Sequence, residues 1–81
     1  MALRSISEEM WMKLFSERLS RLISESGMTQ DEFAKAAHIT KGAVSRYVNG
    51  KSIPSARAII NMARVLRVSI ERLINFGCEI V

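Results

Sequence analysis

The sequence predicts an all-α protein, a compact bundle of about five short helices. Apolar residues recur three to four positions apart, which is the spacing of one helix face, and no segment of useful length alternates apolar and polar residues. Residues that favour helix starts and helix ends separate these stretches. The 81 residues are enough for one small domain, predicted over 1–81, with residues 1–6 and 77–81 as flexible or dimer-forming tails.

The first two predicted helices have clear boundaries. We expect the first over about residues 7–26, ended by Gly27, which adopts a left-handed cap readily. Its apolar stripe consists of Phe15, Leu19, Leu22 and Ile23. The second begins after Thr29, because Thr29 and Glu32 have the spacing of a capping box, which satisfies two free backbone amides. It is short, because Thr40 is already the next capping residue.

The remaining helices follow the same logic. From Thr40 a third helix reaches Val48 or Asn49, with Val44 and Tyr47 towards the core. Ser55 caps a fourth over about residues 55–66, and Ser69 caps a fifth that closes near residue 77. The apolar group around Trp11 has two interpretations, core packing or an exposed edge that packs on a second subunit. The apolar end at 80–81 is expected either to fray or to pack across a dimer axis.

Charge is distributed unevenly along the chain, whose net charge is +4. Residues 1–32 carry four basic and six acidic side chains, whereas residues 33–81 carry eight basic and two acidic ones. A basic half on a small domain favours a polyanionic partner. Solvated helix faces would explain the charge alone equally well.

Other classes of function have little support. The sequence has no Gly-rich phosphate loop and no Ser-His-Asp or Cys-His set with plausible spacing, so we expect neither catalysis nor a cofactor. Cys78 has no second cysteine for a disulfide, and with His38 alone it cannot build a zinc site. No apolar run approaches the ~20 residues of a membrane span, and a reducing, cytoplasmic setting is expected.

The informative unit is residues 29–49, a capped helix, a tight turn and a second capped helix. Ala34 and Ala37 are small where the two helices must approach closely, and Ile39 between them is expected to insert into the core. Such a unit projects its second helix as a ridge, and a helix of this width fits the major groove of B-DNA.

From about Leu19 to Ile74 the sequence resembles the Cro and phage-repressor (XRE-type) helix-turn-helix family, whose fold is lambda-repressor-like. The blocks that match, in order and with agreeing spacing, are Met28–Ala34, Val44–Lys51, Ile53–Ser55 and Ala63–Ser69. The sequence departs from the family pattern at three positions. Gly42 lacks a side chain, Arg67 replaces a frequent glycine in a turn that is a candidate for a changed shape, and Ile23 replaces a frequent arginine.

The resemblance implies two sets of site residues. Base edges would be contacted from the third predicted helix by Lys41, Gly42, Ala43, Ser45 and Arg46. Backbone phosphates would be contacted by Gln30, Thr40, Asn49 and Lys51. Arg46 is the leading candidate for a base contact, since a guanidinium matches guanine O6 and N7 bidentately. Lys41 is expected to contact either a guanine or a phosphate.

The resemblance also implies a function. We expect a transcription regulator, of the Cro repressor type, that binds a near-palindromic double-stranded operator as a homodimer with half-sites about 34 Å apart. The setting would be the nucleoid of a bacterium or a phage-infected host, with no small-molecule ligand and no membrane. One alternative is an antitoxin-type regulator that binds a toxin and its own promoter. Another is a protein-interaction module that has lost DNA binding.

Overall fold

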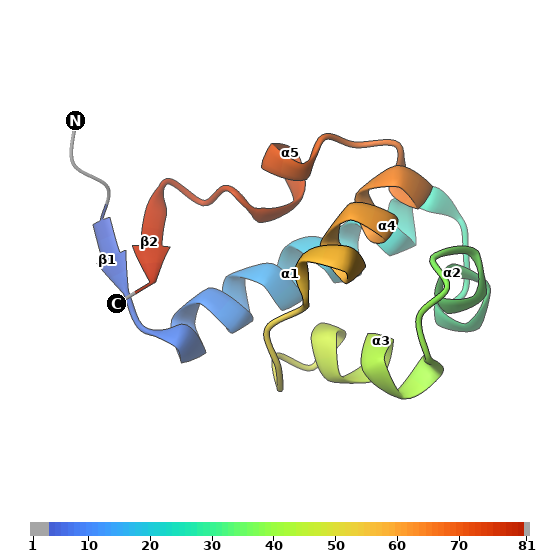
Figure 1. Ribbon diagram of the computed structural model, residues 1–81, viewed down its shortest axis with the longest axis horizontal. Coiled ribbons are helices and arrows are strands. Elements are labelled where there is room, and N and C mark those ends of the chain that lie inside the picture. The colour runs from blue at the N-terminus through green and yellow to red at the C-terminus, as the bar shows by residue number, and fades with distance from the viewer. Residues whose placement is uncertain (1–3, 81) are drawn as a thin grey trace.

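The computed structural model describes residues 4–80 and confirms the all-α core with its five predicted helices (Figure 1). The elements in chain order are β1 (Arg4–Ile6), α1 (Glu8–Ser26), α2 (Gln30–Ala36), α3 (Lys41–Val48), α4 (Ala56–Leu66), α5 (Ile70–Ile74) and β2 (Cys78–Ile80). The molecule is elongated, 38 × 22 × 21 Å, with the strands at one end and α2 towards the other. Residues 1–3 and 81, part of the predicted tails, lie outside the described residues.

Every helix begins at a serine or threonine whose side-chain oxygen accepts a hydrogen bond from a backbone N–H three residues later. These capping residues are Ser7, Thr29, Thr40, Ser55 and Ser69. The capping box of α2 is complete: the Thr29 N–H donates to the Glu32 carboxylate at 2.9 Å, and the Glu32 N–H donates to the Thr29 hydroxyl oxygen at 3.1 Å. The Thr29 backbone and side chain together lower the pKa of the Glu32 carboxyl. This stabilisation is therefore present at neutral pH and is lost on acidification through that pKa.

The turn between α2 and α3 is closed by two backbone hydrogen bonds around His38. The His38 N–H donates to the Lys35 carbonyl at 3.2 Å, and the Ile39 N–H donates to the Ala34 carbonyl at 3.0 Å. This is the Schellman arrangement, which requires a left-handed residue at its centre. His38 supplies that residue with φ of 55°, and Ile39 packs against the core as expected.

Arg67 occupies the same position after α4. Its φ is 57°, and the Arg67 and Val68 N–H groups donate to the carbonyls of Arg64 and Ala63 at 3.2 and 3.0 Å. The arginine itself takes the left-handed conformation that glycine would take. The turn between α4 and α5 therefore keeps its ordinary shape without a glycine.

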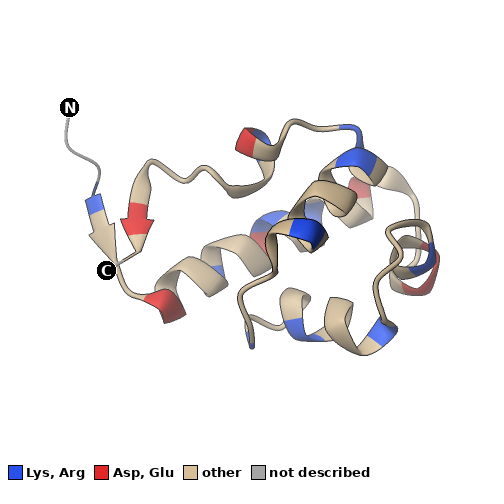
Figure 2. Cartoon of the chain, viewed as in Figure 1, with Lys and Arg blue, Asp and Glu red and all other residues tan. Residues whose placement is uncertain are grey.

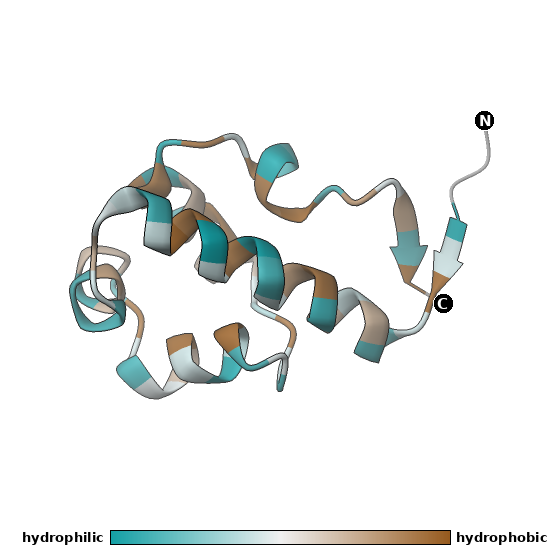
Figure 3. Cartoon of the chain, turned by 180° about the vertical axis from the view of Figure 1, so that it is seen from behind, coloured by the Kyte–Doolittle hydropathy of each residue, from teal (hydrophilic) through white to brown (hydrophobic). Residues whose placement is uncertain are grey.

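The core is built around α1, which runs through the middle of the molecule. Figure 3 shows apolar and polar residues alternating around this helix. Buried residues of α1 are Trp11, Phe15, Leu19, Leu22 and Ile23. The other helices and turns contribute Phe33, Ala34, Ala37, Ala43, Val44, Tyr47, Ala58, Met62, Ala63 and Leu73. The predicted inward positions of the third helix, Val44 and Tyr47, are thus confirmed, and Ala34 and Ala37 are buried at the predicted close approach of the two helices. Trp11, 7% exposed, belongs to the core of its own chain.

Aromatic side chains connect the end of the chain with α3. Trp11 stacks on Phe15 with ring centroids 5.2 Å apart. T-shaped pairs form between Phe15 and Tyr47, with centroids 6.4 Å apart, and between Trp11 and Phe76, with centroids 5.7 Å apart. The Arg18 guanidinium lies 4.6 Å over the Phe76 ring. It also donates to the carbonyls of Arg72 and Asn75 at 2.8 and 2.9 Å. Arg18 therefore fastens the segment after α5 to α1.

The structure contains two short strands, whereas the sequence predicted only helices and the turns between them. β1 and β2 pair in parallel, with Arg4 opposite Cys78, Ser5 opposite Glu79 and Ile6 opposite Ile80. The fifth helix ends at Ile74, earlier than predicted, and the chain then extends into β2. The described parts of both tails thus pair with each other within one chain.

The left-handed conformation of His38 predicts how substitutions at this position change the stability of the protein. A β-branched residue is strongly disfavoured at positive φ, whereas glycine is not. We expect His38→Val to be about 1–2 kcal/mol less stable than His38→Gly, measured by chemical denaturation. At Lys35, within α2, glycine should have no advantage over valine, because the backbone there is helical. Equal stability of the two His38 variants would contradict the role given to this turn.

Candidate nucleic-acid interface

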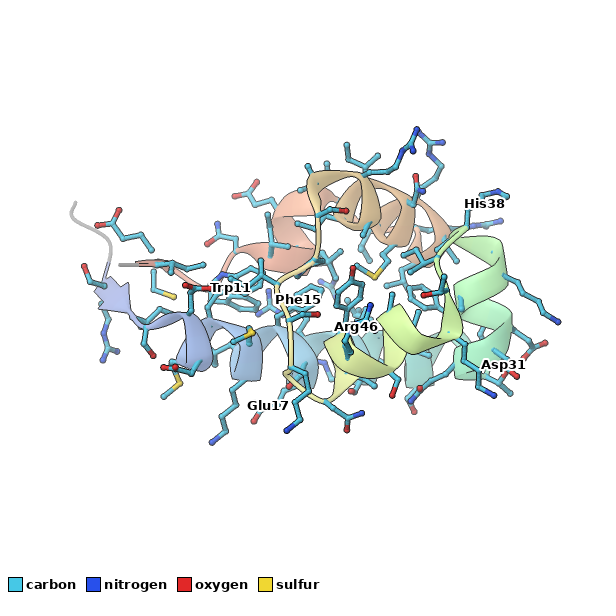
Figure 4. The ribbon with its side chains drawn as sticks, turned by 60° about the horizontal axis from the view of Figure 1, so that its bottom comes forward. Trp11, Phe15, Glu17, Asp31, His38 and Arg46 are labelled. Carbon is cyan, nitrogen blue, oxygen red and sulfur yellow. The ribbon has the colours of Figure 1, made fainter. Side chains whose placement is uncertain are left out.

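Helix α3 presents two distinct faces. It packs against α1 and α2 through Val44 and Tyr47, which are 0% and 8% exposed. The opposite face is exposed and holds Lys41, Gly42, Ser45 and Arg46. Figure 4 shows Arg46 on α3, with Asp31 and His38 marking α2 and the turn between the two helices. The structure thus gathers four of the five predicted base-contacting residues on one surface, which we call the α3 face.

Ala43 does not lie on the α3 face. It is 8% exposed and belongs to the core cluster with Val44 and Tyr47. Its backbone N–H is also taken, because it donates to the Thr40 hydroxyl oxygen at 3.0 Å. We therefore leave Ala43 out of the residues proposed to contact bases.

Gly42 and Arg46 are neighbours on the α3 face. One guanidinium nitrogen of Arg46 lies 3.7 Å from the point that a Cβ of Gly42 would occupy. The arginine therefore extends back along the helix, over the position that has no side chain. Gly42 has no side chain of its own, so the Arg46 guanidinium covers this part of the face.

The predicted phosphate-contacting residues border the α3 face and are all exposed. Gln30 is the first residue of α2, and Thr40 precedes α3 as its cap, with its hydroxyl hydrogen still available to a phosphate. Asn49 is held against the end of α3, because its side-chain nitrogen donates to the Ser45 carbonyl at 2.7 Å. Lys51 is placed by its backbone N–H, which donates to the Arg46 carbonyl at 2.8 Å.

Gly50 makes that placement of Lys51 possible. Its φ is 68°, which closes the end of α3 in the same way as His38 closes α2. A Cβ at this position would also lie 3.6 Å from the Met12 carbonyl oxygen and the Ser16 hydroxyl oxygen of α1. These are ordinary contact distances, so glycine is favoured here by its left-handed backbone conformation.

The electrostatics of this surface favour an anion. Figure 2 shows basic residues on α3, on the loop after it and on α4. No acidic residue occurs between Glu32 and Glu71. Asp31 pairs with Lys41 at 3.3 Å, but both side chains are largely exposed, at 53% and 76%, so the pair is weak and Lys41 can be released to a phosphate. The amino-terminal ends of α2 and α3 add positive dipole ends.

Sequence reasoning missed the contribution of α4. Arg57 lies in its first turn and lines a shallow hollow of about 230 Å³ together with His38, Thr40 and Tyr47. Asn61 ties α4 to the helix-turn-helix, because its side-chain nitrogen donates to the Ala37 carbonyl at 3.1 Å. The position of Arg57 just inside a capped helix start was the available signal. Arg57 adds a further exposed positive charge beside Thr40.

The helix-turn-helix family model HTH_3 matches residues 18–73. The chain belongs to the XRE-type helix-turn-helix family. That family consists of DNA-binding transcription regulators, which are not typically enzymes. The resemblance found in the sequence is thereby confirmed.

Individual relatives agree with the family and with the fold. The chain is 25% identical over 67 residues to the HTH-type transcriptional activator BcrR of Enterococcus faecalis, a match that covers 83% of this chain and 32% of that protein. The chain thus spans about a third of that curated relative. The LexA SOS-response transcriptional repressor of Eubacterium rectale superposes with a TM-score of 0.74 and 26% identity, covering 79% of this chain and 68% of that one.

A second solved structure matches in fold. The restriction-modification controller protein C.AhdI of Aeromonas hydrophila has a TM-score of 0.74 at 22% identity, and the match covers 76% of this chain and 94% of that one.

Within residues 4–80 no helix is long and apolar enough to cross a membrane. The same residues contain no group of three or more His, Cys, Asp or Glu side chains arranged to hold a metal ion.

The geometry of the α3 face predicts the effect of a side chain at position 42 on the stability of the protein. Its φ is not positive and an added Cβ meets only the Arg46 side chain at an ordinary contact distance, so Gly42→Ala should stabilise the protein by about 0.5–1 kcal/mol. Gly50→Ala is the matched control and should destabilise it, because the backbone there is left-handed. Thermal and denaturant unfolding measure both. A loss of stability in Gly42→Ala would contradict the geometry of the face.

Proposed function

We propose that the protein is a sequence-specific regulator that binds double-stranded DNA with α3 in the major groove. The observation that carries the proposal is the α3 face, where Lys41, Ser45 and Arg46 project from a helix whose other side is buried. A polar and basic helix surface of this width suits base edges. An interaction module that had lost DNA binding would be expected to present an apolar or acidic face instead.

The roles of individual residues follow from their positions. Arg46 donates two hydrogen bonds to a guanine, and Ser45 contacts a neighbouring base. Lys41 leaves Asp31 for a guanine or a phosphate. The DNA phosphates along the groove are bound by Gln30, Thr40, Asn49 and Lys51. We add Arg57 to these phosphate-contacting residues. Phosphate contacts fix the register of the protein on the duplex without specifying its sequence.

A homodimer on a near-palindromic operator completes the proposal. Helix α3 has eight residues, so one copy contacts only a few base pairs. Two copies related by a two-fold axis double the contacts, with half-sites about 34 Å apart. Such a dimer acts in the Cro manner, by occupying a promoter in a bacterial nucleoid or a phage-infected host. The relative BcrR is named as an activator. An antitoxin-type regulator would bind a toxin protein as well as its own promoter.

Two substitutions separate base recognition from phosphate attraction. Arg46→Ala should weaken binding to a preferred duplex by about 1–3 kcal/mol and relax specificity at one base position. Lys51→Ala should weaken preferred and random duplexes alike and lower the salt dependence by about one unit of slope. Fluorescence anisotropy over a salt series measures both. Equal losses on the two duplexes for Arg46→Ala would overturn its role in recognition.

A further inference from the structure

The strand end of the molecule has open backbone edges. Each strand has three residues, and within residues 4–80 each pairs only with the other. Parallel sheets in proteins are ordinarily larger and covered on both faces, and a two-stranded ribbon alone is marginally stable in water. Here Ser5 and Glu79, which lie opposite each other in the sheet, are both exposed. Within the described residues, the outer edge of each strand has no partner strand.

Apolar surface lies next to these open edges. Successive residues of a strand point to opposite faces, so Arg4 and Ile6 share one face and Ser5 takes the other. The face with Ile6 lines a hollow of about 340 Å³, whose other residues are Arg4, Met10, Leu14, Phe76 and Cys78. Met10 and Ile80 are 46% and 40% exposed. An open strand beside an apolar hollow is a surface that can take up both the backbone and the side chains of another strand.

We propose that a second copy of this chain docks here, with β1 pairing antiparallel to β1 of the partner subunit about a two-fold axis at Ser5. The product is a four-stranded sheet in the order β2, β1, β1, β2, with the two apolar hollows joined on one face. The proposal deepens the homodimer of the proposed function and depends on it.

Charge selects β1 over β2 as the docking edge. When a three-residue strand pairs fully with its own copy about a two-fold axis, its middle residue stands opposite itself. For β1 this pair is Ser5 with Ser5 of the partner subunit, which are neutral and small. For β2 it would be Glu79 with Glu79 of the partner subunit, and like charges directly opposite are destabilising.

The position of the strands suits a second copy of the chain. A two-fold pairing covers the exposed edge of β1 in both copies at once and closes the assembly, so it does not continue into a fibre. The strands lie at the end of the molecule away from α2 (Figure 1). The α3 faces of both copies therefore stay free for DNA. Arg18 and the T-shaped contact of Trp11 with Phe76 fasten the strand end to the core, so the two DNA-binding units would hold a defined spacing.

Cross-linking of two cysteine variants, without DNA, tests the proposed edge. Ser5→Cys and Glu79→Cys are each made in a Cys78→Ser background and oxidised mildly. In the proposed sheet the two Ser5 positions have Cβ atoms about 5 Å apart, close to disulfide range, whereas the Glu79 positions are three strand spacings apart, about 14 Å. Ser5→Cys should therefore shift from 9.1 kDa to twice that mass on a non-reducing gel, and Glu79→Cys should not.

A charge variant gives an independent measurement. Ser5→Glu places two carboxylates opposite each other, and we expect it to sediment as a monomer with unchanged helical circular dichroism while the unsubstituted protein sediments as a dimer. A monomeric unsubstituted protein, a dimeric Ser5→Glu variant, or cross-linking of Glu79→Cys equal to that of Ser5→Cys would each overturn the proposal. DNA binding by single copies would survive that result, so the failure of the interface and of the DNA-binding function are distinguishable.

Discussion

The packing of α3 onto α1 is the constraint on which the rest of the structure depends. An isolated helix of eight residues is marginal in water, so the burial of one side, and not intrinsic propensity, holds α3 in place. Val44 is fully buried, and the Tyr47 ring makes a T-shaped contact with the Phe15 ring of α1. Once that side is fixed, Ser45 and Arg46 must point away from the core. The core therefore determines which residues a DNA duplex would meet.

Helix ends determine where α3 starts and stops. The turn at His38 brings the chain out of α2, Thr40 caps the new helix, and Gly50 closes it against α1. Asn61 holds this unit on α4 through the Ala37 carbonyl. The hydrogen bonds made at each of these places satisfy backbone groups that would otherwise be left free at a helix terminus. The same bonds that complete the backbone pairing thus position Lys51 and the α3 face.

Local signals made most of the fold predictable. Capping residues and apolar spacing act within a few positions of the chain, so the five helix starts and the burial of Val44 and Tyr47 could be derived from sequence. Ala43 could have been recognised as buried, because it lies four residues before Tyr47 and so shares its side of the helix. The β1–β2 pairing could not, since three-residue strands carry no alternation signal and their partners lie at opposite ends of the chain. Arg67 shows that a side chain can occupy a left-handed turn when the surrounding hydrogen bonds define it.

We propose that the α3 face specifies a DNA sequence. Selection of bound duplexes from a random library at about 0.15 M salt, followed by sequencing, tests it most directly, because neither the operator nor the interface need be known. We expect enrichment of a near-palindrome with half-sites one helical turn apart. Retention of duplexes without enrichment, lost as salt rises, would show phosphate attraction alone and would contradict it.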